Sequence, residues 1–100
     1  MAGKLIPYDM VEFLKTEEDI ADYLEAVLEE DDPALLVRAL GNIARARGMT
    51  DIAREIGASR GSLYRSLSEN GNPSFMTVVR VLGALGIKLH VGPLSPVTTA

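Results

Sequence analysis

The chain has 100 residues, of which 47% are hydrophobic, and it contains no cysteine. This length suits one globular domain with a single core, and the lack of cysteine excludes disulfide bonds and thiolate metal sites. No apolar run approaches the roughly 18 residues of a membrane-spanning helix, and no signal-peptide pattern opens the chain. We therefore expect a cytoplasmic protein without a membrane contact.

The net charge of −4 combines two regions of opposite sign. Residues 1–31 hold ten carboxylates against two lysines, a charge of −8, whereas residues 32–100 hold eight basic side chains against four carboxylates, a charge of +4. Such asymmetry suggests two different interaction surfaces. The simpler alternative is that the acidic part is only the solvated face of a helix.

The residue pattern in the first third of the chain predicts one amphipathic helix. Pro7 interrupts any helix near the start, and Thr16 followed by Asp19 forms a capping-box pattern. Apolar residues then recur at three- and four-residue spacing, which predicts a helix over about residues 17–30 with an acidic outer face. We treat residues 1–31 as an acidic N-terminal segment.

The next helix begins at Asp32-Pro33, because an acidic N-cap followed by proline at the first helical position is a typical start. Gly48 is expected to end this helix, after two arginines whose charge suits its carbonyl end. The buried stripe is expected to contain Leu36, Ala39, Leu40 and Ile43.

The segment from Met49 to Ser68 is the most informative part of the sequence. It predicts two short helices, the first capped by Thr50 and the second by Ser59, with a tight turn at Gly57 between them. Two helices in this order are typical of a helix-turn-helix, whose second helix lies in the major groove of DNA. The first functional hypothesis is therefore a protein that reads double-stranded DNA.

Turn residues at 69–73 separate this motif from a last helix that Ser74 caps. The residues expected to face inward from that helix are Phe75, Val78, Val79, Leu82 and Leu85. Residues 87–91 alternate apolar and polar side chains, which predicts a short strand that must pair with the N-terminal segment or with a second subunit. The DNA-binding domain would thus span residues 32–91, followed by a flexible tail at residues 92–100.

The exposed face of the second motif helix carries the candidates for reading base edges, and helix termini nearby carry candidates for phosphate contacts. The base-contact candidates are Ser59, Arg60, Gly61, Tyr64, Arg65 and Ser68. The phosphate-contact candidates are Arg45, Arg47, Thr50, Arg54, Ser62 and Asn72. Arg60 and Arg65 are the strongest, because a bidentate arginine–guanine contact contributes about 1–3 kcal/mol of discrimination. Either arginine could instead contact phosphate alone.

Catalysis finds little support in the sequence. His90 is the single histidine and the chain has no cysteine, so no Cys-His pair can form and a nucleophilic triad is poorly supplied. No HExxH or phosphate-cradling glycine motif is present. We expect no enzymatic activity, no catalytic residue, no metal and no cofactor.

The run from Ala39 to Leu89 resembles the addiction-module antidote proteins, which are HigA-like antitoxins within the Cro/C1-type (XRE-like) helix-turn-helix class. The motifs that carry the resemblance are Ala44-Arg45-Ala46-Arg47-Gly48-Met49-Thr50, Ser62-Leu63-Tyr64-Arg65 and Gly71-Asn72-Pro73-Ser74-Phe75. The resemblance extends over nearly the whole chain. It implies an all-α fold, a four- to five-helix lambda-repressor-like DNA-binding domain, here with an acidic N-terminal helix and a short C-terminal β-strand. Ser66 departs from the wider repressor class, which often has a larger apolar residue there.

The resemblance also implies a function: an antitoxin encoded beside a small RelE/HigB-like toxin that cleaves mRNA. Such antitoxins neutralise the toxin and repress their own operon. We expect a homodimer, because helix-turn-helix proteins gain affinity by reading two half-sites, with residues 87–91 or the last helix as the dimer surface. The acidic segment would complement a basic toxin. Two alternatives stay open: a phage-type repressor without a toxin, and a protein-interaction module that has lost DNA binding.

Overall fold

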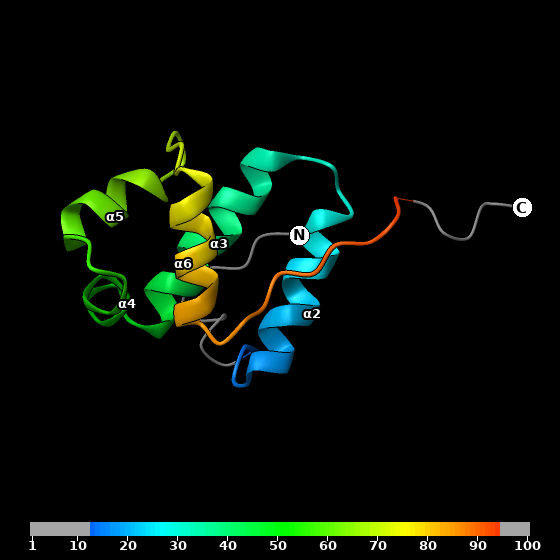
Figure 1. The fold of residues 1–100 in the computed structure, drawn as a ribbon, viewed down its shortest axis with the longest axis horizontal. Coiled ribbons are helices and arrows are strands. Elements are labelled where there is room, and N and C mark those ends of the chain that lie inside the picture. Colours follow the sequence, from blue (N-terminus) through cyan, green and yellow to red (C-terminus); the bar gives the residue numbers. More distant parts are fainter. Residues whose placement is uncertain (1–12, 95–100) are drawn as a thin grey trace, which may run out of the picture.

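The computed structural model describes residues 13–94, and the regular structure in this range is helical. The helices are α2 (Glu17–Leu28), α3 (Pro33–Arg47), α4 (Met49–Ile56), α5 (Arg60–Ser66) and α6 (Phe75–Ala84). Figure 1 shows α6 in front of α3, with α2 on one side and the two short helices α4 and α5 on the other. The predicted all-α class is confirmed for these residues. None of their helices is long and apolar enough to cross a membrane.

Side-chain caps begin four of the helices, as the sequence predicted for each of them. Thr16 and Asp19 form a capping box at α2: the Asp19 amide donates to Thr16 Oγ1 at 3.1 Å, and the Thr16 amide donates to the Asp19 carboxylate at 3.2 Å. Asp32 caps α3, Ser59 caps α5 and Ser74 caps α6. Each cap pairs a backbone amide that has no partner inside its helix.

The prediction that Thr50 caps α4 is wrong. The helix begins at Met49, directly after Gly48, and no side chain caps its first turn. Gly48 has a φ of 118°, a backbone conformation that suits glycine, and it both ends α3 and precedes α4. The change of direction is completed in this one residue, so Thr50 falls inside the first turn, where it is exposed.

The strand predicted for residues 87–91 is also wrong for the single chain. A Schellman motif at Gly86 ends α6: the Ile87 amide donates to the Leu82 carbonyl at 2.8 Å, and the Gly86 amide donates to the Gly83 carbonyl at 3.0 Å. The chain then passes α2 without regular secondary structure (Figure 1). Residues 13–94 contain no other strand with which it could pair, and an unpaired strand is not stable.

One hydrophobic core joins the helices. Its most completely buried large side chains are Ile20, Leu40, Ile43, Leu63, Leu67, Val81 and Leu85. The inward face predicted for α6 is partly wrong, because Phe75 is 72% exposed and Val79 is 37% exposed, whereas Val81 is fully buried. Nearly every position of α6 is apolar, so the periodicity does not define which face turns inward.

The close contact between α3 and α5 depends on a glycine. A Cβ atom added to Gly41 would lie 2.5 Å from the carbonyl oxygen of Leu67, which directly follows α5. No side chain larger than hydrogen fits this contact without a backbone shift. The contact places the end of α5 against α3 and brings Arg45, one turn further along α3, beside α5.

Candidate nucleic-acid interface

The α4–α5 pair is joined by a three-residue turn, Gly57-Ala58-Ser59. Gly57 adopts the left-handed conformation, with φ 75° and ψ 30°. The Ala58 amide donates to the Ala53 carbonyl at 2.9 Å and the Gly57 amide donates to the Arg54 carbonyl at 3.3 Å, which completes a Schellman motif. Ser59 then caps α5 by accepting from the Ser62 amide at 3.1 Å. Backbone hydrogen bonds therefore define the angle between the two helices.

One face of α5 is anchored in the core and the opposite face is open. Leu63 and Leu67 are each only 1% exposed and pack against the core of the protein. The exposed residues of α5 are Arg60, Gly61, Ser62, Tyr64 and Arg65. The sequence thus correctly separated the inner from the outer side of this helix.

The ring of Tyr64 contacts the guanidinium groups of two arginines that lie on different helices. The Cζ atom of Arg60 lies 5.4 Å from the centroid of the Tyr64 ring, and the Cζ atom of Arg45, on α3, lies 5.7 Å from it. Arg45 also donates to Asn42 Oδ1 at 2.9 Å. Both arginines lie within cation–π range, where each contact contributes about 0.5–1 kcal/mol at exposed sites. We call Arg45, Arg60 and Tyr64 the arginine–tyrosine cluster.

Arg65 adds a third positive charge to this surface. Its Nη1 atom lies 4.0 Å from the position that a Cβ atom would take on Gly61, so the side chain follows the helix back toward the preceding turn. Among residues 13–94, no carboxylate forms an ion pair with Arg60 or Arg65. These charges are therefore available to an external anion.

A second group of polar side chains lines a hollow of about 310 Å³ between the turn of the α4–α5 pair and the start of α6. Ser62 and Asn72, both predicted as phosphate contacts, lie in its wall together with Arg80. The hydroxyl groups of Ser74 and Thr77, 3.0 Å apart, lie in the same wall. Sequence reasoning did not select Arg80, because only the folded chain brings this part of α6 beside Ser62 and the turn of the α4–α5 pair.

Other predicted candidates lie outside this surface or are already engaged. Arg54 pairs with Asp51 at 3.4 Å, and the Ser68 hydroxyl donates to the Arg65 carbonyl at 2.8 Å. Thr50, as noted above, is exposed in the first turn of α4.

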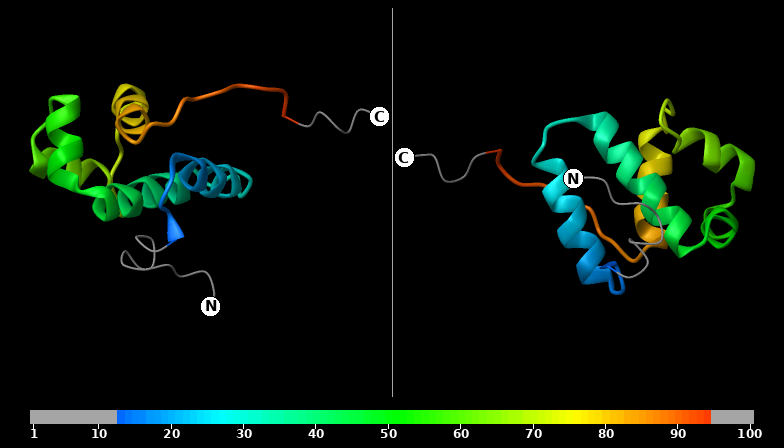
Figure 2. Two further views of the ribbon diagram at one scale, coloured as in Figure 1. Left: turned by 90° about the horizontal axis from the view of Figure 1, so that it is seen from below. Right: turned by 180° about the vertical axis from the view of Figure 1, so that it is seen from behind.

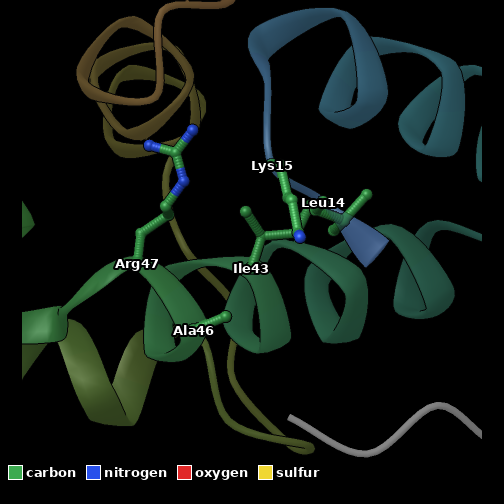
Figure 3. A pocket seen from close by; sticks show the side chains of 5 residues that line it. All are labelled: Leu14, Lys15, Ile43, Ala46 and Arg47. Atoms are coloured by element: carbon green, nitrogen blue, oxygen red, sulfur yellow. The ribbon is translucent and has the colours of Figure 1, made fainter. Parts of the chain in front are cut away.

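Arg47 lies on a different side of α3 from the arginine–tyrosine cluster. It lines a hollow of about 240 Å³ together with Leu14, Lys15, Ile43 and Ala46, all shown in Figure 3. Two residues along an α-helix turn the side chain by about 200°, so Arg47 points away from the side on which Arg45 meets Tyr64. Arg47 is therefore not brought into the α5 surface.

The acidic surface lies at the other side of the molecule. On α2 the exposed carboxylates include Glu18, Asp22 and Glu25, which follow one another at helical spacing and form one solvent-facing side. Figure 1 places α2 across α3 from the α4–α5 pair. The acidic and basic regions of the sequence thus lie on opposite sides of the folded protein.

These features define a small helical protein with an arginine-rich helix pair on one side and an acidic helix on the other. The model of the protein family described as "probable addiction module antidote protein" matches residues 4–93, and the chain belongs to this family. An uncharacterized protein of Haemophilus influenzae is 47% identical over 91 residues, which cover 91% of this chain and 94% of that protein. No solved structure matches the chain. The predicted antidote family is confirmed, and its antitoxin role implies a toxin as partner.

Proposed function

We propose that the chain is an antitoxin that represses its own operon and neutralises a small basic toxin of the RelE/HigB-like, mRNA-cleaving kind. In this proposal the α4–α5 pair is the helix-turn-helix of a lambda-repressor-like, HigA-like domain, and two copies bind the operator. The observation that carries the proposal is the open face of α5, where Arg60 and Arg65 are exposed without an ion-pair partner among the described residues.

The α5 helix has the features that a major-groove helix needs. Arg60 occupies its first position, from which side chains reach base edges. The ring of Tyr64 holds the Arg60 guanidinium at the surface, so less side-chain entropy is lost when the arginine binds. The fork of the guanidinium group then matches the O6 and N7 acceptors of guanine.

The hollow beside the turn suits the DNA backbone. Ser62, Asn72 and Arg80 offer hydroxyl, amide and guanidinium donors in one wall, and such donors bind phosphate without reading sequence. A phosphate held there would fix the register of α5 in the groove. The acidic side of α2 repels DNA, and for the same reason it attracts a basic protein, so we place the toxin on that side.

The proposal is tested by replacing Arg60 and Arg65 together by alanine. Titration with DNA from the promoter of its own operon, followed by fluorescence anisotropy, should show an affinity loss of about 30-fold or more, since two base contacts of at least about 1 kcal/mol each are removed. Growth rescue on co-expression with the neighbouring toxin gene should be unchanged, because neither arginine lies on α2.

The matched control is the pair Lys15→Ala and Lys88→Ala, which removes the same charge from parts of the chain outside α5. Equal affinity of the two double variants would reject base reading by α5. A wild-type chain that neutralises the toxin but binds no promoter DNA would identify a protein-interaction module. A neighbouring product without toxicity would favour a phage-type repressor.

A further inference from the structure

An apolar groove runs along the end of α2, beside the segment that follows α6. A hollow of about 210 Å³ lies between α2 and residues 87–90, and Figures 1 and 2 show this segment passing α2 after it leaves α6. A second hollow, of about 330 Å³, lies at the turn between α2 and α3. Leu28 and Leu36 line both hollows, so the two adjoin and form one groove. We call it the α2 groove.

The lining of the α2 groove is mainly apolar, and part of it is open to solvent. Its larger aliphatic residues are Leu24, Leu28, Leu36, Leu82, Ile87 and Leu89. Leu24 and Leu82 are buried, whereas Leu28 is 53% exposed and Leu89 is 46% exposed. The Ile87 amide donates to the Leu82 carbonyl at 2.8 Å, which fixes the start of the outer wall. The fold thus provides a buried apolar base and leaves two leucines that another molecule can cover.

The rim of the α2 groove is acidic. Glu25, Asp31 and Asp32 line the groove and are exposed. Lys88 is the one cation among the lining residues, and His90 is counted as neutral at pH 7. Three carboxylates against one lysine give these lining residues a net charge of −2. An apolar recess with such a rim suits a partner that combines an apolar side chain with positive charge.

We infer that the α2 groove binds a segment of the basic toxin in which lysine or arginine residues flank a large apolar side chain. The apolar side chain covers Leu28 and Leu89, and its basic neighbours face Glu25 and Asp31. An apolar anchor in a recess contributes much of the affinity of a protein interface, whereas charges at the rim mainly raise the rate of association. The inference rests on the proposed function, which places the toxin on the acidic side, and it adds where the toxin is held and by which chemistry.

Charge favours this occupant over the alternatives. The three carboxylates of the rim repel DNA. A second copy that docked on the same groove by two-fold symmetry would bring two acidic rims together, which is unfavourable. A basic protein is less suited to the hollow beside Leu14, because Lys15 and Arg47 line that hollow. It is also less suited to α6, which contains no carboxylate.

The apolar contact is tested by Leu28→Gln, which replaces an exposed leucine by a polar side chain of similar size. Calorimetric titration with the purified product of the neighbouring toxin gene should show an affinity loss of about tenfold, the scale expected when the burial of one leucine is lost. Leu94→Gln is the matched control, because it makes the same substitution at a 96% exposed position outside the groove. The control should bind the toxin like the wild type, and both variants should bind promoter DNA like the wild type.

The outcomes of this titration separate the inference from the proposed function. Equal toxin affinity of Leu28→Gln and Leu94→Gln would overturn the inference and leave the antitoxin function standing. A wild-type chain that does not bind the toxin would reject both. Light scattering without toxin adds a further check: a mass that falls from two chains to one in Leu28→Gln alone would show that a second copy occupies the groove, which would also overturn the inference.

The acidic rim is tested by Asp31→Asn combined with Asp32→Asn. Asparagine tolerates the left-handed backbone of residue 31, whose φ is 58°, and it caps a helix as well as aspartate does at residue 32. Association with the toxin should slow by about threefold at low salt and differ little at high salt, since only charge has been removed. Glu55→Gln combined with Glu69→Gln removes the same charge outside the groove. Equal rates in the two double variants would overturn the assignment of the rim.

Methyl NMR locates the contact without any substitution. The methyl signals of Leu28 and Leu89 should change when the toxin is added, whereas those of Leu94 should not. Unchanged Leu28 and Leu89 signals in a sample that binds the toxin would place the toxin elsewhere and overturn the inference.

Discussion

α2 and α5 are built on the same principle but present opposite surfaces. Each fixes one face in the common core through an aliphatic side chain, Ile20 in α2 with 0% exposure and Leu63 in α5 with 1% exposure. The outer face of α2 carries carboxylates, whereas α5 carries Arg60 and Arg65 and no carboxylate. The core therefore determines where each helix lies, and the exposed charges determine what it can bind.

The two helices also differ in the charge of the side chains in their first turns, next to the positive end of the helix dipole. α2 has Glu17, Glu18 and Asp19 in its first turn, where negative charge is favourable. α5 begins with Arg60, a positive charge at the positive end of the dipole, which is unfavourable by a few tenths of a kcal/mol or more. The cation–π contact of Arg60 with Tyr64, about 0.5–1 kcal/mol at exposed sites, offsets this cost. The proposed contact with DNA would be a second reason for an arginine at this place.

Replacing the core anchors should have the largest effect. Ile20→Ala and Leu63→Ala should each lower the free energy of unfolding by about 2–5 kcal/mol, because each leaves a cavity in the same core. Urea titration followed by circular dichroism should show one cooperative transition for both variants. Leu28→Ala, at a 53% exposed position of α2, is the control and should cost much less. Two separate transitions would show that the acidic and basic regions fold independently.

Gly41→Ala should have the next largest effect. The added methyl group would meet the Leu67 carbonyl, so α5 must move away from α3 and the free energy of unfolding should fall by about 1–3 kcal/mol. Gly61→Ala is the matched control, because only the flexible end of Arg65 lies near its new Cβ atom. There alanine should stabilise the helix by about 0.5–1 kcal/mol. Thermal melts of both variants test this contrast, and equal melting temperatures would contradict it.

Reversal of charge on α2 should lower the rate of association with the toxin by about tenfold. Glu18→Lys combined with Glu25→Lys should slow association with the toxin by roughly that factor at low salt, and the difference should shrink as salt is added. Surface plasmon resonance measures the rate. The control, Glu55→Lys with Glu69→Lys, has the same net charge but leaves α2 intact. If both double variants slow association equally, the toxin does not approach through α2.

The smallest effects are expected from the helix caps. Thr16→Ala and Ser59→Ala each remove a hydroxyl that accepts an amide hydrogen bond of 3.1 Å, and each should cost about 1 kcal/mol of stability. Denaturant titration measures this loss in the free energy of unfolding. Only Ser59→Ala should also weaken promoter binding, since its cap positions Arg60. An equal loss of DNA affinity in both variants would mean that the effect comes from stability alone.

The start of most helices and the open side of α5 can be predicted from neighbouring residues alone. Asp32, Ser59 and Ser74 act through hydrogen bonds that reach only two or three residues along the chain, so their pattern can be read without a structure. The same holds for the turn at Gly57, where a left-handed residue is needed.

Packing between the helices sets the inward face of α6, the cluster of Arg45 with Tyr64, and the hollow that unites Ser62 with Arg80. These features arise from packing between residues that are far apart in the sequence. The missing strand after α6 has the same cause, because strand formation depends on a neighbour that the alternation of side chains does not specify. Local hydrogen bonds depend on residues that are neighbours in the sequence, whereas packing contacts depend on how the helices are arranged in the folded chain.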